Sequence, residues 1–233
     1  MILNQLIRPA LVGIGFYSIF FIALAGVACT QSDENSDDTL VAAAAVVVAQ
    51  AQAASSGSSS STGCSGSGHC KMYVTNANAT LNAGVTGLDS QCASDANKPS
   101  GSSTFKAMVA DGTNRIACTS ANCGGGTSEH TNWVLKASKE YRRTDGTTVI
   151  ATTTANGVFS FPLTAAIQTT IVGTNSTVTG LNTNWTSSAS DCTNFTSTGA
   201  NTSNGLHDET STNLLSIGTS GCGNTMKVIC VEQ

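Results

Sequence analysis

The sequence has little charge and few aromatic side chains. Charged residues make up 10% of the 233 positions, aromatic residues make up 5%, and there are three prolines. Leaving out Arg8 and the four carboxylates between residues 33 and 38, nine basic residues face ten acidic ones from residue 64 onward. This near-neutral balance lacks the basic footprint of a nucleic-acid-binding protein, so we expect no nucleic-acid partner. Gly, Ser, Thr, Asn and Ala dominate, which favours strands, turns and loops over long helices.

Motifs of the common hydrolases are also missing. The sequence contains no G-x-S-x-G and no H-E-x-x-H, and the S-x-x-K match at Ser103–Lys106 is followed by neither S-D-N nor K-T-G. His69, His130 and His207 lie in polar stretches, where solvated loop positions are the default interpretation. We therefore expect no catalytic residue, no metal, no cofactor and no small-molecule substrate. A hydrolase with an unrecognised site is the least favoured alternative.

Residues 1–28 have the pattern of a signal peptide. Arg8 supplies the positive charge, and an almost unbroken apolar run from Ala10 to Ala28 ends in small residues. The segment Leu24-Ala-Gly-Val-Ala-Cys29 resembles a relaxed bacterial lipobox, which predicts lipidation of Cys29 with acyl chains such as palmitate. Cleavage near Ala28 without lipidation and an uncleaved membrane anchor are the alternatives. We expect an exported, membrane-attached protein.

Residues 29–63 are predicted to be a disordered tether. An acidic run is followed by an Ala- and Val-rich piece, Leu40–Ala54, and then by the Ser/Gly tract Ser55–Gly63. The apolar piece is too short to span a bilayer, and the Ser/Gly tract is typical of flexible coil. The segment would hold a folded domain, residues 64–233, away from the membrane.

Nine cysteines are present, and setting Cys29 aside for the lipid leaves an even set of eight. In an exported domain such a set indicates up to four disulfides, whose connectivity spacing alone does not fix. Proximity favours Cys64–Cys70 and Cys118–Cys123. A zinc site at Cys64, His69 and Cys70 is a weaker alternative, because no second ligand pair follows at zinc-finger spacing.

The first part of the domain predicts two strands and one helix. The strands are Lys71–Thr75 and Thr104–Ala110. The helix begins near Thr86, which we expect to be its N-cap, with Asp89 reaching back as in a capping box. Cys92 belongs to a row of apolar residues at every fourth position, so it would face inward.

The middle of the domain predicts an antiparallel meander. Asp145-Gly146 separates Glu140–Arg143 from Thr147–Thr153, and Asn156-Gly157 separates the latter from Val158–Leu163. Both dipeptides supply the positive φ that two-residue hairpin turns require.

The last part of the domain predicts strands at its two ends. Residues 177–181 form a short candidate strand, and residues 186–220 show little regular pattern. The C-terminus has the apolar pattern of a buried central strand on both faces, with Met226, Val228 and Cys230 on one and Ile229 and Val231 on the other.

One local excess of positive charge stands beside two aromatic residues. As a ligand contact it would serve sulfated glycans or acidic patches of host proteins. The alternative is that these cations form a solvated hairpin rim whose charge is balanced by nearby glutamates. Such exposed ion pairs contribute little to stability. The candidate ligand-binding residues are Trp133, Lys136, Lys139, Tyr141, Arg142 and Arg143.

Several short motifs occur in the order found in endostatin, the C-terminal domain of certain collagens. They include Gly87-Leu-Asp-Ser-Gln-Cys92, Phe159-Ser-Phe161, Asp191-Cys-Thr-Asn-Phe195 and the closing segment from Cys222 to Glu232. Over residues 71–233 the chain resembles the leptospiral endostatin-like lipoproteins, the Len family, which combine a lipobox, a tether and one such domain. Val178 and Phe195 stand where relatives often carry Trp.

The resemblance implies an α+β fold, the endostatin-like variant of the C-type lectin-like fold. Mostly antiparallel strands and one or two short helices would be braced by nested disulfides, Cys92–Cys230 and Cys192–Cys222. In the chain-entropy estimate these loops contribute about 5 and about 3.6 kcal/mol.

The resemblance also implies a function. It predicts a lipid-anchored lipoprotein of the bacterial outer membrane, exposed at the cell surface, that acts in virulence as a non-catalytic adhesin. Its partners would be host extracellular-matrix proteins such as laminin and fibronectin, and plasminogen or complement factor H. The alternative is a structural or housekeeping envelope lipoprotein without a host ligand.

Overall fold

A computed structural model describes Cys64, residues 68–101 and residues 103–233, and the fold is given for these residues. All of them belong to one compact unit, residues 58–233. The predicted signal peptide, the lipidation site Cys29 and the tether lie outside the described residues. Within the described ranges no helix is both long and apolar enough to cross a bilayer.

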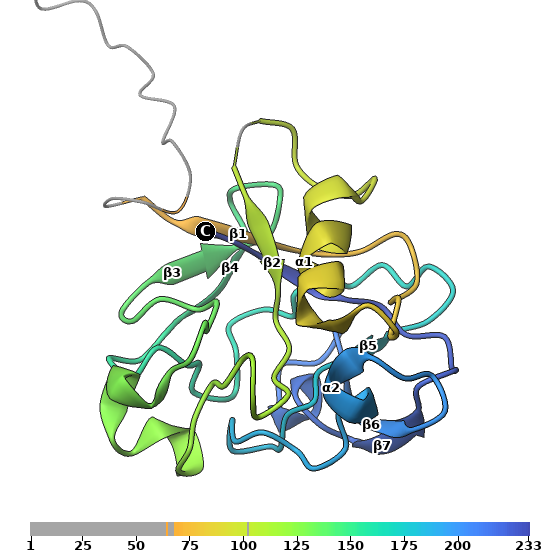
Figure 1. The fold of residues 1–233 in the computed structure, drawn as a ribbon. Coiled ribbons are helices and arrows are strands. Elements are labelled where there is room, and N and C mark those ends of the chain that lie inside the picture. Colours follow the sequence, from red (N-terminus) through yellow and green to blue (C-terminus); the bar gives the residue numbers. More distant parts are fainter. Residues whose placement is uncertain (1–63, 65–67, 102) are drawn as a thin grey trace, which may run out of the picture. The chain divides into compact units, whose positions relative to one another are not determined.

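The domain is a mixed α+β fold in which most neighbouring strands pair antiparallel (Figure 1). A five-stranded sheet has the order β2-β8-β1-β3-β4, and a three-stranded sheet has the order β5-β6-β7. Within the first sheet β1 and β3 run parallel. The elements are β1 (Cys70–Val74), α1 (Gly84–Ser94), β2 (Phe105–Ala107), η1 (Ala121–Cys123), η2 (Gly126–Glu129), β3 (Glu140–Arg142), β4 (Val149–Thr152), β5 (Ser176–Val178), α2 (Cys192–Phe195), β6 (Asn201–Leu206), η3 (Thr212–Leu214), β7 (Gly218–Gly221) and β8 (Ile229–Glu232).

Strand β8 lies inside the five-stranded sheet and separates two hydrophobic clusters. It pairs antiparallel with β1 and with β2. Ile229 and Val231 belong to one cluster, and Val228 and Cys230 belong to the other. The predicted C-terminal strand with two apolar faces is therefore confirmed. A strand buried on both faces needs apolar side chains at successive positions, and this closing segment supplies them.

Helix α1 lies against β2 (Figure 1) and buries Val85, Leu88 and Cys92. The predicted capping box is wrong, because the N-cap is Ala83 and it makes no side-chain cap bond. The carboxylate of Asp89 instead faces β2, where its Oδ1 accepts a hydrogen bond of 2.9 Å from the backbone N–H of Ala107. The acidic side chain thus joins the helix to the sheet.

The meander is confirmed in its first half only. β3 and β4 pair antiparallel around the Asp145-Gly146 turn, where Gly146 has a φ of 72°. The Asn156-Gly157 turn also forms, since the Thr154 N–H donates to the carbonyl of Val158 over 2.8 Å. Residues 158–163, which were predicted to be a strand, are irregular. Their apolar side chains pack into the core without strand pairing.

The three-stranded sheet was not predicted beyond its first strand. β6 pairs with β5 and with β7 within the stretch that shows little regular pattern in the sequence. Thr202, Ser203 and Asn204 of β6 are all buried. A buried strand made of polar residues lacks the apolar alternation that identifies strands in a sequence.

Eight cysteines form four disulfides: Cys64–Cys70, Cys92–Cys230, Cys118–Cys123 and Cys192–Cys222. These are the pairs expected from spacing and from the endostatin resemblance. The second joins α1 to β8 across 138 residues, and the fourth joins α2 to the residue after β7 across 30 residues. The C-terminal strand is therefore covalently linked to helix α1.

The short element α2 is a left-handed turn. All four of its residues, Cys192–Phe195, have a φ of 57° or 58°. Left-handed helical backbone costs an L-residue roughly 1–2 kcal/mol per residue. The Asp191 side chain accepts a hydrogen bond from the Asn194 N–H, and the Cys192–Cys222 disulfide holds the first residue, so the surrounding structure maintains this conformation.

Candidate functional site

The six candidate ligand-binding residues come from β3 and the segment before it. In β3 the side chains alternate, so Glu140 and Arg142 point outward while Tyr141 is fully buried. The Tyr141 hydroxyl accepts a hydrogen bond of 2.8 Å from the Lys136 N–H, and its ring packs edge-on against Phe159. Burial raises the pKa of Tyr141 to about 12. Tyr141 therefore offers no surface to a ligand.

Trp133 is also a packing residue. Its ring meets that of Trp185 edge-on with centroids 6.0 Å apart, and its Nε1–H donates to the carbonyl of Gly157 over 3.1 Å. It is only partly buried and packs against the larger hydrophobic cluster. The two aromatic candidates thus anchor the segment to the core, and the surface part of the candidate site consists of the four cations.

Arg142, Arg143 and Lys136 hold the local structure through hydrogen bonds of their side chains. Arg142 Nε forms an ion pair of 2.7 Å with Glu140 Oε1, and its Nη1 donates to the Gly146 carbonyl. Arg143 Nε donates to the Ala166 carbonyl over 2.8 Å. Lys136 Nζ donates to the Cys64 carbonyl over 3.2 Å. The Glu140 carboxylate therefore locally neutralises Arg142.

A hollow of about 460 Å³ adjoins this surface at the start of the described domain. Its lining includes His69, Lys139 and Glu140, together with Ser138 and Thr152. The pKa of His69 is lowered, first by burial and then by the nearby Arg142 guanidinium. An imidazole whose protonation is disfavoured, beside one cation and one carboxylate, gives the hollow a mixed, weakly charged lining.

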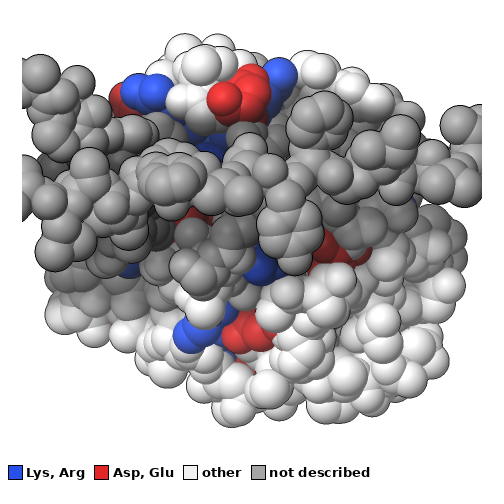
Figure 2. Space-filling view, turned by 90° about the horizontal axis from the view of Figure 1, so that it is seen from above, with Lys and Arg blue, Asp and Glu red and all other residues white. Residues whose placement is uncertain are grey.

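Charge of both signs is interspersed on the face shown in Figure 2. Among the described atoms of this face, blue Lys and Arg atoms lie next to red Asp and Glu atoms. Such a surface produces a weak net field. Electrostatic recognition at this face would therefore depend on individual charged side chains.

His207 and His130 take structural positions. His207 is buried, and its two ring nitrogens face the carbonyls of Gln168 and Thr174. His130 Nδ1 lies 2.5 Å from the Ala117 carbonyl oxygen. Among the described residues, no group of three or more His, Cys, Asp or Glu side chains is placed to hold a metal ion. The expectation of a site without metal stays a prediction.

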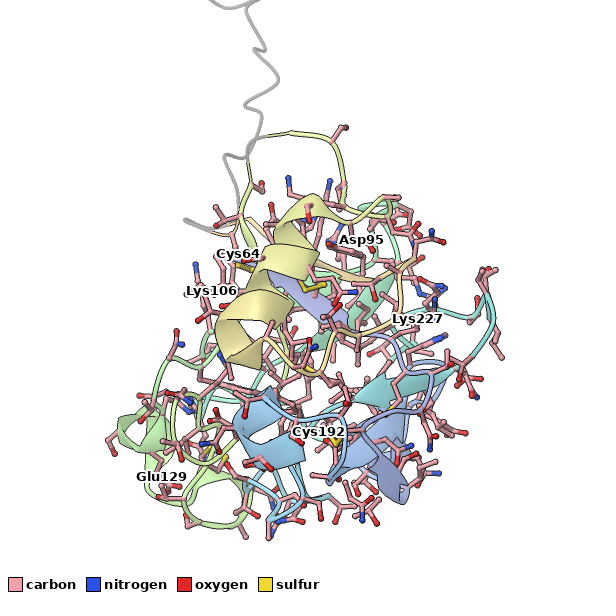
Figure 3. All side chains as sticks on the ribbon, turned by 45° about the vertical axis from the view of Figure 1, so that its right-hand side comes forward. Cys64, Asp95, Lys106, Glu129, Cys192 and Lys227 are labelled. Atoms are coloured by element: carbon pink, nitrogen blue, oxygen red, sulfur yellow. A yellow bond between two sulfur atoms is a disulfide. The ribbon has the colours of Figure 1, made fainter. Side chains whose placement is uncertain are left out.

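Glu129 closes the loop that carries the Cys118–Cys123 disulfide. Its carboxylate accepts hydrogen bonds from the N–H and hydroxyl groups of Thr119 and Ser120 and from the Gly125 N–H. The Ser120 hydroxyl and N–H contribute most to lowering the pKa of Glu129 to about 2. In Figure 3 it lies at the lower left, well away from Cys64. It stabilises a loop and is not part of the cation surface, which is the surface formed by Lys136, Lys139, Arg142 and Arg143.

A buried ion pair was missed by sequence reasoning. Arg115 is completely buried, and its Nη1 and Nη2 donate to the two carboxylate oxygens of Asp89 over 2.9 and 2.7 Å. Its Nε donates to the Asn132 carbonyl and its Nη1 to the Ala107 carbonyl. The pair links α1, β2 and the segment that leads to the cation surface. The sequence signal was the position of Asp89, three residues before the inward-facing Cys92 and hence on the same helix face.

Comparison with protein families gives a match to a large part of the chain. Residues 72–213, more than half of the chain, match a family model described as "Protein of unknown function (DUF1554)". The match begins in β1 and ends in η3, so it includes the cation surface, the buried ion pair and two of the three strands of the smaller sheet, β5 and β6. Among curated proteins no match is found. This chain belongs to the DUF1554 family.

Proposed function

We propose that this protein is a non-catalytic binding lipoprotein, anchored through Cys29 to the bacterial outer membrane and exposed at the cell surface. It acts as an adhesin for host extracellular-matrix proteins such as laminin and fibronectin, and for plasminogen or complement factor H. Its domain takes the endostatin-like variant of the C-type lectin-like fold. The observation that carries the proposal is the nested pair of disulfides, Cys92–Cys230 and Cys192–Cys222, which the endostatin resemblance implies.

The disulfides bear on function in two ways. They form and persist in oxidising compartments outside the cytoplasm, which agrees with an exported protein. They also engage all eight cysteines of residues 64–233, so this part of the chain has no free thiol to serve as a nucleophile. A rigid, covalently braced domain suits the presentation of a binding surface.

The cation surface supports a role in binding. Lys136 and Lys139 lie on the segment before β3, and Lys136 contacts Cys64, the first described residue of the domain. Lys136 is exposed, and acidic patches of matrix proteins and sulfated glycans are the ligands that a surface lysine favours. This part of the proposal concerns the cations alone, because Trp133 and Tyr141 pack into the core.

Solid-phase binding of the purified full chain to laminin, fibronectin, plasminogen and factor H tests the proposal. We expect saturable binding to at least one of them that weakens as salt is raised. The double reversal Lys136→Glu/Lys139→Glu should weaken it at least severalfold. Lys98→Glu/Lys106→Glu makes the same change in net charge elsewhere and should leave it unchanged.

Two results would count against the proposal. Absence of binding to all four proteins would favour a structural envelope lipoprotein without a host ligand. Binding that is insensitive to salt and equal in both double variants would show that Lys136 and Lys139 do not contribute to it. Intact disulfides, checked by mass spectrometry of the non-reduced protein, and an unchanged melting temperature show that each variant keeps the wild-type fold.

A further inference from the structure

An uncharged hollow of about 430 Å³ lies outside the cation surface. Four separate segments form its walls: Asn122, residues 154–161, residues 183–184 and Thr212. None of the lining residues is charged. Its volume falls within the range of about 300–1,000 Å³ that small-molecule sites occupy.

One aromatic ring borders the hollow in a fixed position. Phe161 is partly buried, and its ring stacks on that of Trp185 with centroids 5.9 Å apart and an interplanar angle of 18°. Trp185 is fully buried, and its Nε1–H donates to the Phe159 carbonyl over 3.1 Å. Since one face of Phe161 lies against Trp185, the remainder of the ring gives the hollow a rigid apolar surface.

The rest of the lining offers hydrogen-bonding groups that the protein leaves unused. Within the described chain, the hydroxyls of Ser160, Thr183 and Thr212 and the side-chain amide of Asn122 have no hydrogen-bond partner. The Asn156 side chain makes one long bond of 3.4 Å to the Asn122 carbonyl. Hydroxyl groups donate and accept, and amides do both through separate atoms. The hollow therefore presents neutral donors and acceptors around an aromatic ring.

The walls are held together before any ligand arrives. The Asn122 N–H donates to the Asn184 carbonyl over 2.8 Å, which connects two walls. The neighbouring Cys123 is tied to Cys118 by a disulfide. A third wall is a closed turn, in which the Thr154 N–H and hydroxyl both donate to the Val158 carbonyl. A preformed site loses less conformational entropy on binding than a mobile one.

This combination discriminates between ligand classes. A phosphate or carboxylate would need a cationic partner, and a cationic ligand would need a carboxylate, but the lining has neither. A purely apolar ligand would desolvate the hydroxyls and amides without replacing their bonds, which is costly. A neutral saccharide carries hydroxyls that both donate and accept, and its ring has an apolar face that packs on an aromatic side chain. We propose that the hollow binds a neutral saccharide and that Phe161 and Asn122 are its main contacts.

Two sources would supply such a ligand, namely glycans of host glycoproteins and the amino-sugar chains of the bacterial envelope. The test uses the purified full chain with N-acetyllactosamine oligosaccharides as the first probe and chitooligosaccharides as the second. Binding is measured by calorimetry and by tryptophan fluorescence, because Trp185 stacks on Phe161. We expect at least one of the two probes to bind, equally well with and without a calcium chelator.

The variants are chosen to keep the fold. Phe161→Leu retains an apolar side chain against Trp185 but removes the aromatic ring, and should weaken binding by roughly three- to tenfold. Asn122→Gly removes the amide at a position with a φ of 53° that glycine adopts freely, and should weaken it by roughly two- to tenfold. Asn224→Ala, an exposed amide outside the hollow, serves as the matched control and should bind as the wild type does.

The outcomes separate this inference from the proposed adhesin. Loss of saccharide binding in both hollow variants, with laminin or fibronectin binding unchanged, supports it. Failure of both probes to bind the wild type would overturn it, whatever the matrix proteins do. Binding that survives in Phe161→Leu and Asn122→Gly, or that requires calcium, would also overturn it. Unchanged melting temperatures identify the variants in which a loss is not due to unfolding.

Discussion

Removing Asp89 should destabilise the domain more than removing any exposed charge. The Arg115 side chain is fully buried, whereas that of Asp89 is 22% exposed, and two short hydrogen bonds join them. The Asp89→Ala change leaves a buried guanidinium without its counter-ion, for which losses of about 3–5 kcal/mol are typical. It also removes the acceptor of the Ala107 N–H. In a domain of this size 1 kcal/mol corresponds to about 2–4 °C, so the melting temperature should fall by about 6–20 °C.

Urea denaturation at neutral pH with the disulfides intact measures this loss. The double variant Asp89→Leu/Arg115→Met should be more stable than the sum of the single changes predicts, because it leaves no unpaired charge. Arg142→Met at the exposed pair with Glu140 serves as the control and should cost under about 1 kcal/mol. A loss below about 1 kcal/mol for Asp89→Ala, or strict additivity in the double variant, would refute the reasoning.

Three further predictions concern single residues. The pKa of Glu129 is lowered to about 2 by its hydrogen bonds, so its contribution to stability is complete above pH 4.5 and is lost as the pH falls toward 2. The melting temperature of Glu129→Gln should therefore depend less on pH over that interval than the melting temperature of the wild type. An equal pH dependence in both proteins would contradict this. Thr193 is exposed with a φ of 57°, so Thr193→Gly should raise the free energy of unfolding by roughly 0.5–1 kcal/mol; a loss in urea titration would show that the turn is not left-handed. A Cβ at Gly205 would lie 1.9 Å from the Leu214 carbonyl oxygen, whereas the atom nearest to a Cβ at Gly199 would be 3.8 Å away. Measured by calorimetry, Gly205→Ala should therefore lower the free energy of unfolding by at least about 2 kcal/mol, and Gly199→Ala should lower it by under about 0.5 kcal/mol. Equal losses would contradict the packing described.

The apolar parts of the fold were readable from the sequence. The C-terminal strand, strand β1 and helix α1 have apolar side chains at the period of their structure, so pattern alone identifies them. The Asp145-Gly146 hairpin was readable because its turn requires positive φ. In these segments local preference and tertiary packing agree.

The polar parts of the fold were not readable. Strand β6 buries Thr202, Ser203 and Asn204, whose hydrogen bonds compensate for burial but leave no apolar alternation in the sequence. The left-handed turn at residues 192–195 consists of residues with no preference for positive φ other than Asn194. Such segments take their conformation from neighbouring elements and disulfides, and these contacts are long-range.

The candidate sites, too, were readable from the sequence only where the signal is local. The cations around β3 were readable as a local excess of charge, but the burial of Tyr141 and the packing of Trp133 depend on Phe159 and Trp185, which come from later segments. The uncharged hollow has no sequence signal, because its walls come from four separate segments of ordinary Asn, Ser and Thr residues. A recess made by tertiary packing becomes visible only in three dimensions.

Exposure of the protein on intact cells tests the central claim most directly. Living cells are treated with a protease that does not enter the envelope, and the remaining full-length protein is quantified beside a periplasmic control protein. A surface adhesin tethered through Cys29 should be removed while the control survives. Survival of the protein until the outer membrane is permeabilised would place it inside the envelope and contradict the account.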